Sequence, residues 1–267
     1  MMGRIGLLGS QPVMPPAVPA PELSDLLTEG QSLRIFPSPV GLFPRTPLDV
    51  LLQEAGHMEA ALRAEEAGCV GAVIDSIGDY GLEAMRGSLS IPVAGAGEEG
   101  VRAAAAGGRR FAIVTVWPES MNFIPRRTMD RQGRAGACTG IHNVGSETQL
   151  ETLAGPDGYL EQIRTGASSL RKRIAAACAD ARDQGAEAIL LGCTCMSALA
   201  RDIAAETPLP VINPLAAGLS ALLSGGVPAS RGAFRTPARE ALTMMVDALS
   251  TMPAEDCSVC VTQWDEI

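Results

Sequence analysis

The sequence predicts an α/β protein with two related lobes, each containing a mostly parallel sheet. Short apolar segments that end on glycine or a small polar residue alternate with longer segments of helical spacing, which is typical of parallel strands covered by helices. The chain also contains an internal duplication, because residues 68–76 and 185–193 share one plan: a glycine stops a helix and a buried strand follows. Finally, 46% of the 267 residues are apolar and 19% are charged, as in a folded globular protein.

In the first half, apolar runs too short for helices predict strands at residues 4–10, within 68–76, at 32–37 and at 91–93. Residues 47–67 have apolar positions at helical spacing after a proline that suits a first helical turn, so we expect a helix there. We expect His57, which lies far from any strand end, on the surface of that helix. Acidic residues after Gly97 suit the start of another helix.

The second half repeats this plan. Strands are expected at residues 110–116, 138–144, 188–191 and 209–212. One helix is expected to end at about residue 132, and another to begin at residue 197. Further helices are expected at 160–183, as one long helix, at 215–223 and at 236–249. We therefore assign residues 1–107 and 214–267 to lobe 1 and residues 108–213 to lobe 2.

Composition excludes several classes of function. A net charge of −9 argues against binding to nucleic-acid phosphates, and an aromatic content of 3% argues against base stacking. No apolar run is long enough to span a membrane, and the apolar N-terminus is better interpreted as a strand than as a signal peptide. Seven cysteines, an odd number, predict reduced thiols in a cytoplasmic protein. Cys257 and Cys260 have metal-like spacing but no second pair, so no metal site is predicted.

The duplicated segments also place chemistry-bearing residues. Cys193 falls between a strand and a helix, where open α/β sheets bind ligands and where a helix N-terminus favours a thiolate. Ser76 occupies the matching position of the first copy. Four further polar residues follow the upstream strands and are candidate substrate contacts, although ordinary loop and helix-start roles are equally compatible: Ser10, Gln11, Thr115 and Ser120.

A thiolate can act as a nucleophile, exchange disulfides or transfer protons. Nucleophilic hydrolysis favours a histidine base, and the chain has only His57 and His142. Redox enzymes favour two spacers between paired cysteines, whereas Cys193 and Cys195 have one. Proton transfer needs neither feature, so the sequence favours chemistry at a carbon acid without a cofactor.

Four segments, residues 78–82, 91–98, 191–196 and 209–212, resemble the Asp/Glu/hydantoin racemase superfamily, and the resemblance covers about residues 4–223. It implies two pseudosymmetric Rossmann-like lobes, an active site in the cleft between them, and no pyridoxal phosphate or metal. It also implies a small-molecule substrate and is compatible with a homo-oligomer. The superfamily includes arylmalonate decarboxylases and maleate isomerases, and its racemases use one acid/base cysteine from each lobe.

The resemblance transfers unevenly to this chain. Cys193 has the position of the second-lobe cysteine, and Thr194 that of a substrate-holding residue. Ser76 stands where hydantoin racemases have the first-lobe cysteine, and Tyr80 where they have proline. Two further positions depart from the family's pattern: Cys195 stands where glycine or histidine is commoner, and Asn213 where aspartate is commoner. Ile77, beside Ser76, is expected to be a further substrate contact, as is Cys195.

A serine hydroxyl is a weaker base than a thiol, so three outcomes stay open. Asp75 or Asp79 assists Ser76, the substrate has an acidified hydrogen, or Cys193 alone moves protons after a decarboxylation. Ser76 could equally serve only as a hydrogen-bonding group for the substrate. Our preferred interpretation is a cofactor-independent racemase or epimerase acting at a carbon α to a carboxylate or cyclic imide. The alternatives are an arylmalonate-type decarboxylase and a non-catalytic small-molecule binding protein.

Overall fold

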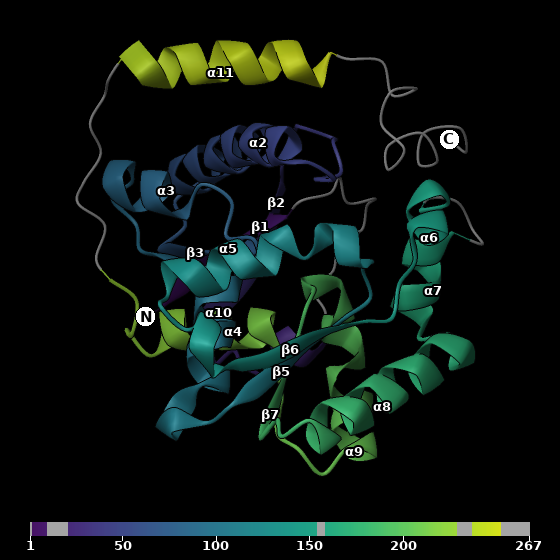
Figure 1. The fold of residues 1–267 in the computed structure, drawn as a ribbon. Coiled ribbons are helices and arrows are strands. Elements are labelled where there is room, and N and C mark those ends of the chain that lie inside the picture. Colours follow the sequence, from purple (N-terminus) through teal and green to yellow (C-terminus); the bar gives the residue numbers. More distant parts are fainter. Residues whose placement is uncertain (1, 10–20, 154–157, 229–236, 252–267) are drawn as a thin grey trace.

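Two four-stranded sheets form the centre of the molecule (Figure 1). The structure, a computed structural model, describes residues 2–9, 21–153, 158–228 and 237–251. The strand orders are β2-β1-β3-β4 and β6-β5-β7-β8, and all pairs are parallel. The strands are β1 Gly3–Gly9, β2 Gln31–Pro37, β3 Gly71–Asp75, β4 Val93–Gly95, β5 Phe111–Thr115, β6 Cys138–Asn143, β7 Ala188–Leu191 and β8 Val211–Ile212. Because both sheets have the same order, the predicted α/β fold with two related lobes is confirmed.

Helices cover the sheets, with α2 and α3 beside the first sheet and α8 and α9 beside the second (Figure 1). They are α1 Pro21–Ser24, α2 Pro47–Glu66, α3 Leu82–Ser88, α4 Ala96–Ala104, α5 Phe123–Arg131, α6 Glu147–Glu151, α7 Tyr159–Thr165, α8 Ser168–Asp183, α9 Ala200–Glu206, α10 Pro214–Leu223 and α11 Pro237–Ser250. The start of α2 is fixed by a capping box, in which Thr46 and Asp49 bond each other's backbone N–H groups. Among the described residues, we find no helix with the length and apolarity needed to cross a membrane.

Two sequence-based expectations about helices are wrong in detail. The single helix expected at 160–183 is divided into α7 and α8, because Gly166 adopts a φ of 64° and ends α7. That left-handed conformation suits glycine and stops the regular helical hydrogen bonds. Similarly, the segment after Cys193 begins as a 3₁₀ helix, η4 Thr194–Leu199, before α9 starts.

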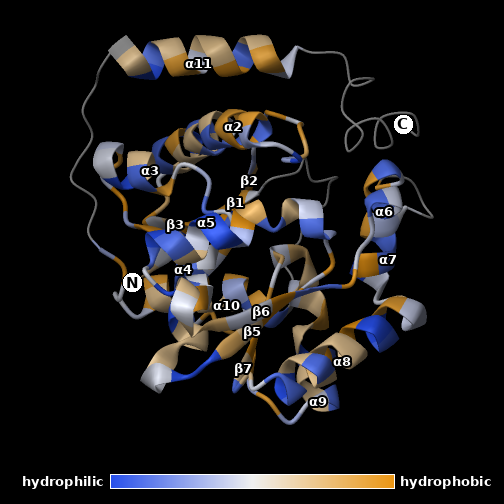
Figure 2. Ribbon diagram, viewed as in Figure 1, coloured by the Kyte–Doolittle hydropathy of each residue, from blue (hydrophilic) through white to orange (hydrophobic). Residues whose placement is uncertain are grey.

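The buried apolar residues form several clusters, one of which crosses between the lobes. Helix α10 packs Leu219 and Leu222 against Ile5 and Val73 of the first sheet, which supports our proposal that this C-terminal helix belongs to lobe 1. One buried cluster joins Tyr80 of the first half to the strands of the second sheet. Figure 2 shows these central strands coloured hydrophobic and the outer helices α8 and α9 carrying hydrophilic residues. The lobes are thus held by shared packing as well as by the hydrogen bonds described next.

Candidate active site

The loops that follow β3 and β7 touch each other. The Thr194 hydroxyl donates to the backbone carbonyl of Asp75 over 3.3 Å, and Asp75 is the last residue of β3. From the second lobe, the buried hydroxyl of Thr128 on α5 donates to the carbonyl of Ile77 over 2.8 Å. The structure therefore brings together the segment containing Ser76 and the segment containing Cys193, which lie more than a hundred residues apart in sequence.

Cys193 lies at the N-terminus of η4, as the sequence predicts for a thiolate site. Its backbone is extended, and its Sγ accepts a hydrogen bond from the Cys195 N–H over 3.1 Å. A donor in this position stabilises negative charge on sulfur. In this structure the Cys193 and Cys195 sulfur atoms form a disulfide, so the expectation of reduced thiols is wrong for this pair. Cys193 can carry a proton only after this disulfide is reduced.

Ser76 is held by a backbone N–H group of its own loop. Its side chain is 8% exposed, and its Oγ accepts a hydrogen bond from the Gly78 N–H over 3.1 Å. Ser76 is thus fixed in orientation within its loop, which is what a group that meets a substrate carbon at one angle requires.

The two acidic candidates have different surroundings. The Asp79 carboxylate accepts hydrogen bonds from the N–H groups of Gly97 and Glu98, over 2.8 and 2.6 Å, at the start of α4. Burial raises the pKa of Asp79 to about 7, and these two N–H groups oppose the rise. Asp79 has a φ of 48°, a strained value for a residue other than glycine. The hydrogen bonds from α4 to its carboxylate hold the tight loop in this conformation.

Asp75 lies where the two loops meet. Burial raises its pKa to about 6, and a hydrogen bond between its side chain and that of Thr194 opposes the rise. Asp75 therefore lies between the two lobes, whereas Asp79 is engaged with the backbone of α4. Of the two, Asp75 is better placed to influence a substrate.

The remaining predicted contacts lie around these loops. The Thr115 hydroxyl, buried at the end of β5, donates to the Gly192 carbonyl and accepts from the Trp117 N–H, each over 3.3 Å. These bonds fix the glycine that precedes Cys193. Ser120 is exposed and donates to Glu147 over 3.1 Å. Ser10, Gln11 and the tail cysteines Cys257 and Cys260 lie outside the described residues.

The environment of His57 differs from the one that the sequence predicts. This residue is fully buried on α2 rather than on its surface, so that expectation is wrong. Its Nδ1 lies 2.8 Å from the Gln53 carbonyl, and its ring packs edge-on against Tyr80 with centroids 5.2 Å apart. Burial lowers the pKa of His57 to about 4, so the ring is neutral at neutral pH. The only signal in the sequence was its position among the apolar residues of the helix.

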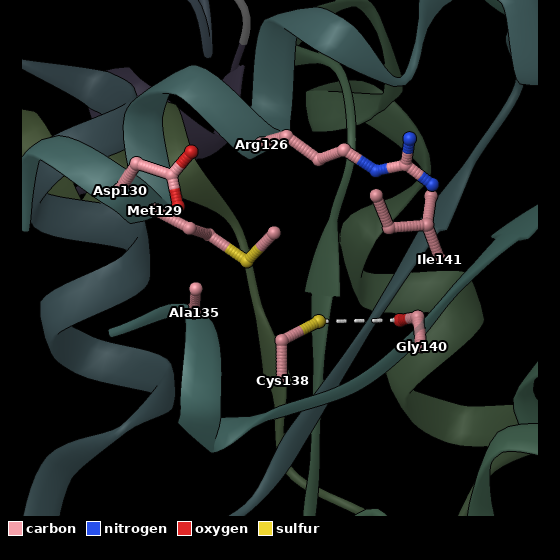
Figure 3. Close-up of a pocket in the computed structure, with 7 residues that line it drawn as sticks. All are labelled: Arg126, Met129, Asp130, Ala135, Cys138, Gly140 and Ile141. Carbon is pink, nitrogen blue, oxygen red and sulfur yellow. Dashed lines mark hydrogen bonds between the residues drawn. The ribbon is translucent and has the colours of Figure 1, made fainter. Parts of the chain in front are cut away.

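A hollow of about 350 Å³ lies away from this site, between α5 and β6 (Figure 3). Cys138 lines it at the first residue of β6, which pairs with the beginning of β5, so the hollow is at the opposite end of the sheet from Thr115. Burial raises the pKa of the Cys138 thiol, which disfavours its thiolate. Within the described part of the chain, no group of three or more His, Cys, Asp or Glu residues could hold a metal ion.

Comparison with known proteins identifies the family. The profile described as Asp/Glu/Hydantoin racemase matches residues 40–222, which include both loops. The chain belongs to the Asp/Glu/hydantoin racemase family. The match contains Ser76 and Cys193, so the candidate site described above lies within the matched residues.

Curated relatives are hydantoin racemases. The chain is 30% identical over 171 residues to the hydantoin racemase of Pseudomonas sp. (strain NS671), and this match spans 64% of each protein. It is 33% identical over 178 residues to that of Rhizobium meliloti, covering 65% of this chain and 69% of the relative. The chain thus spans just under two thirds of the length of the first of these relatives.

Solved structures confirm the fold. An allantoin racemase from Klebsiella pneumoniae superposes with a TM-score of 0.69 at 22% identity, covering 85% of this chain and 90% of the other. A double mutant of arylmalonate decarboxylase in its liganded form superposes with a TM-score of 0.59 at 14% identity, covering 86% and 97%. At these identities the superpositions show a shared architecture, and the reaction is argued from the site.

Proposed function

We propose that the reduced protein is a cofactor-independent racemase that acts on a carbon acid of the hydantoin type, at the carbon beside a cyclic imide carbonyl. The observation that carries this proposal is the meeting of the Ser76 loop and the Cys193 loop through Thr194 and Asp75. Family membership and the hydantoin racemase relatives support the choice of substrate class.

In the proposed reaction, the Cys193 thiolate removes the α-hydrogen of the substrate. The carbon–hydrogen bond breaks, a sulfur–hydrogen bond forms, and the electron pair moves to the imide oxygen. Backbone N–H groups of the two loops are proposed to donate to this enolate oxygen. Ser76 then delivers a proton to the opposite face, which inverts the carbon, and solvent restores both groups. Thr194, Cys195 and Ile77 are proposed to line the substrate position.

Decarboxylation is the second candidate because Ser76 replaces the family's first-lobe cysteine. In that reaction carbon dioxide leaves, and Cys193 alone protonates the resulting enolate, so only one enantiomer of the product forms. The fold shared with arylmalonate decarboxylase is compatible with this chemistry.

One assay distinguishes racemisation from decarboxylation. The reduced protein is incubated in D₂O with an optically pure 5-substituted hydantoin and, separately, with an arylmalonate. Racemisation with deuterium incorporation supports the proposed function, whereas carbon dioxide release with a single product enantiomer supports the alternative. Activity toward neither substrate contradicts both substrate classes.

A further inference from the structure

Glu22, on the short helix α1, has a carboxylate oxygen that is buried without a hydrogen-bond donor. The residue as a whole is partly exposed, but its Oε1 is shielded from solvent, and none of the described N–H or O–H groups donates to it. An unpaired buried acceptor costs free energy, and a charged one costs more than a neutral one. An N–H group of a bound ligand would remove this cost. Glu22 is therefore a candidate for contact with a substrate.

Helix α1 lies beside the segment that follows Cys193, because it contacts the 3₁₀ helix η4. Two residues next to Glu22 in sequence fix this position. Leu23 is 1% exposed and shares a buried cluster with Ile5 of the first sheet. Asp25 forms an ion pair with Arg201 of α9, beside the second sheet. The helix is thus held against both halves of the molecule.

The charge of Glu22 acts on Asp75, the residue at which the two loops meet. Burial is the main cause that raises the pKa of Asp75 to about 6, and the negative charge of Glu22 adds to this rise. The Asp75 carbonyl accepts the hydrogen bond from Thr194 that joins the loops. Two carboxyl groups, those of Glu22 and Asp75, therefore lie near the junction of the Ser76 and Cys193 loops.

Two neighbouring carboxyl groups discriminate between substrates by charge. An arylmalonate is a dicarboxylate, and it would bring two more negative charges into a partly buried region where repulsion is weakly screened. A hydantoin ring is neutral and has two N–H groups, which are the donors that the Glu22 oxygen lacks. The acidic pair therefore favours the hydantoin ring over the dicarboxylate.

We propose that Glu22 determines substrate specificity, because its carboxylate accepts a hydrogen bond from a ring N–H of the substrate and repels dicarboxylates. The inference rests on the proposed function and deepens it by naming the substrate class, a neutral cyclic ureide or imide with a free N–H group. Hydrogen bonds to a carboxylate are stronger than those between neutral groups, so Glu22 also orients the ring. Proton transfer stays with Cys193 and Ser76.

Binding tests this role without turnover. Cys193→Ala is introduced so that neither the disulfide nor racemisation interferes. Titration calorimetry then gives Kd for an optically pure 5-substituted hydantoin, its N1-methyl and N3-methyl derivatives, and an arylmalonate. Adding Glu22→Gln keeps the size of the side chain and removes its charge. This change is expected to weaken hydantoin binding by about 10-fold and to strengthen arylmalonate binding. The derivative methylated at the nitrogen that meets Glu22 should bind both chains with the same Kd.

Glu29→Gln is the matched control, because it removes the same charge from an exposed residue between α1 and β2. It is expected to leave all four Kd values unchanged, and circular dichroism verifies that each chain is folded. If Glu22→Gln leaves the hydantoin Kd unchanged, or weakens the hydantoin and both methyl derivatives equally, Glu22 accepts no substrate N–H and the proposal is wrong.

The outcome for Glu22 is separate from the outcome for the proposed function. If the hydantoin binds with the expected pattern but reduced wild-type protein does not racemise it, the proposed function fails and the role of Glu22 in binding stands. If the wild-type protein racemises the hydantoin and Glu22→Gln has no effect on its Kd, the function stands and this inference fails. A hydantoin that is neither bound nor racemised would contradict both.

Discussion

At the scale of single residues, the chemistry depends on the oxidation state of Cys193. A sulfur in a disulfide cannot remove or deliver a proton, and its partner Cys195 is two residues away with a Cα–Cα distance of 5.2 Å. Neither the position of Cys193 at a helix N-terminus nor its contact with the Cys195 N–H needs that disulfide. The reduced protein should therefore hold the sulfur in the orientation that proton transfer requires.

We predict that racemase activity requires a reductant. Protein isolated without reductant should gain activity on treatment with a dithiol such as dithiothreitol, measured as the initial rate of loss of optical rotation. Cys195→Ala should make the activity independent of reductant because no disulfide can form with Cys193. Activity of wild-type protein that is fully retained after oxidation, with the disulfide verified by mass spectrometry, would contradict this prediction.

His57 gives a pH-dependent prediction for stability. Its pKa is about 4 in the folded protein and about 6.5 unfolded, so the unfolded chain binds more protons between these values. The contribution of the neutral His57 ring to the free energy of unfolding is fully present above about pH 6.5. It is lost as the pH falls toward 4, and the loss amounts to at most about 3 kcal/mol. Asp75 and Asp79, whose pKa values are raised, act in the opposite direction.

A comparison of wild-type protein with His57→Gln isolates this effect because both chains contain the same aspartates. The free energy of unfolding, measured by urea titration at pH 7 and pH 4.5, should fall more for the wild-type protein than for the variant. Equal falls would show that His57 is not buried in its neutral form.

At the scale of elements, the start of α4 depends on glycine. A Cβ on Gly97 would lie 2.1 Å from the Ile77 carbonyl oxygen, so the helix can approach the Ser76 loop only where a side chain is missing. The sequence indicated the helix start from its acidic residues. It could not indicate this close approach, because that depends on how two segments twenty residues apart pack.

Gly97→Ala should therefore destabilise the protein by about 1–3 kcal/mol and lower activity, because the Ser76 loop must shift. Gly87→Ala on α3 is the matched control, since a Cβ there meets no atom within 4 Å and alanine favours helix. Thermal unfolding by circular dichroism and the racemisation rate check both variants. If the two substitutions behave alike, the close contact is not important.

At the scale of the whole molecule, the two halves form one site because polar bonds cross between them. Thr128 on α5 holds the Ile77 carbonyl, so an element of the second lobe positions the loop of the first. Thr128→Val should lower kcat severalfold and destabilise by about 1–2 kcal/mol, because a buried carbonyl loses its donor. Thr139→Val removes a similar bond to the Phe111 carbonyl at the far end of the second sheet and should leave kcat unchanged. Similar losses of kcat in both variants would contradict this account.

The sequence predicted the architecture because its signals are local. Buried strands, their terminal glycines and the duplication place Ser76 and Cys193 at matching strand ends. The division of the helix at Gly166, the burial of His57 and its edge-on packing against Tyr80 were not predicted. Each depends on a left-handed residue or on packing between distant segments, which periodicity does not report.

The central claim is proton transfer by Cys193 in the reduced state, and deuterium exchange tests it most directly. Reduced wild-type protein and Cys193→Ala are incubated in D₂O with an optically pure 5-substituted hydantoin, and loss of the α-proton signal is followed by NMR. The account predicts exchange with loss of optical activity in the wild-type protein and a rate lower by about 10²- to 10⁴-fold in the variant. Equal exchange by both proteins, above the rate without protein, would contradict it.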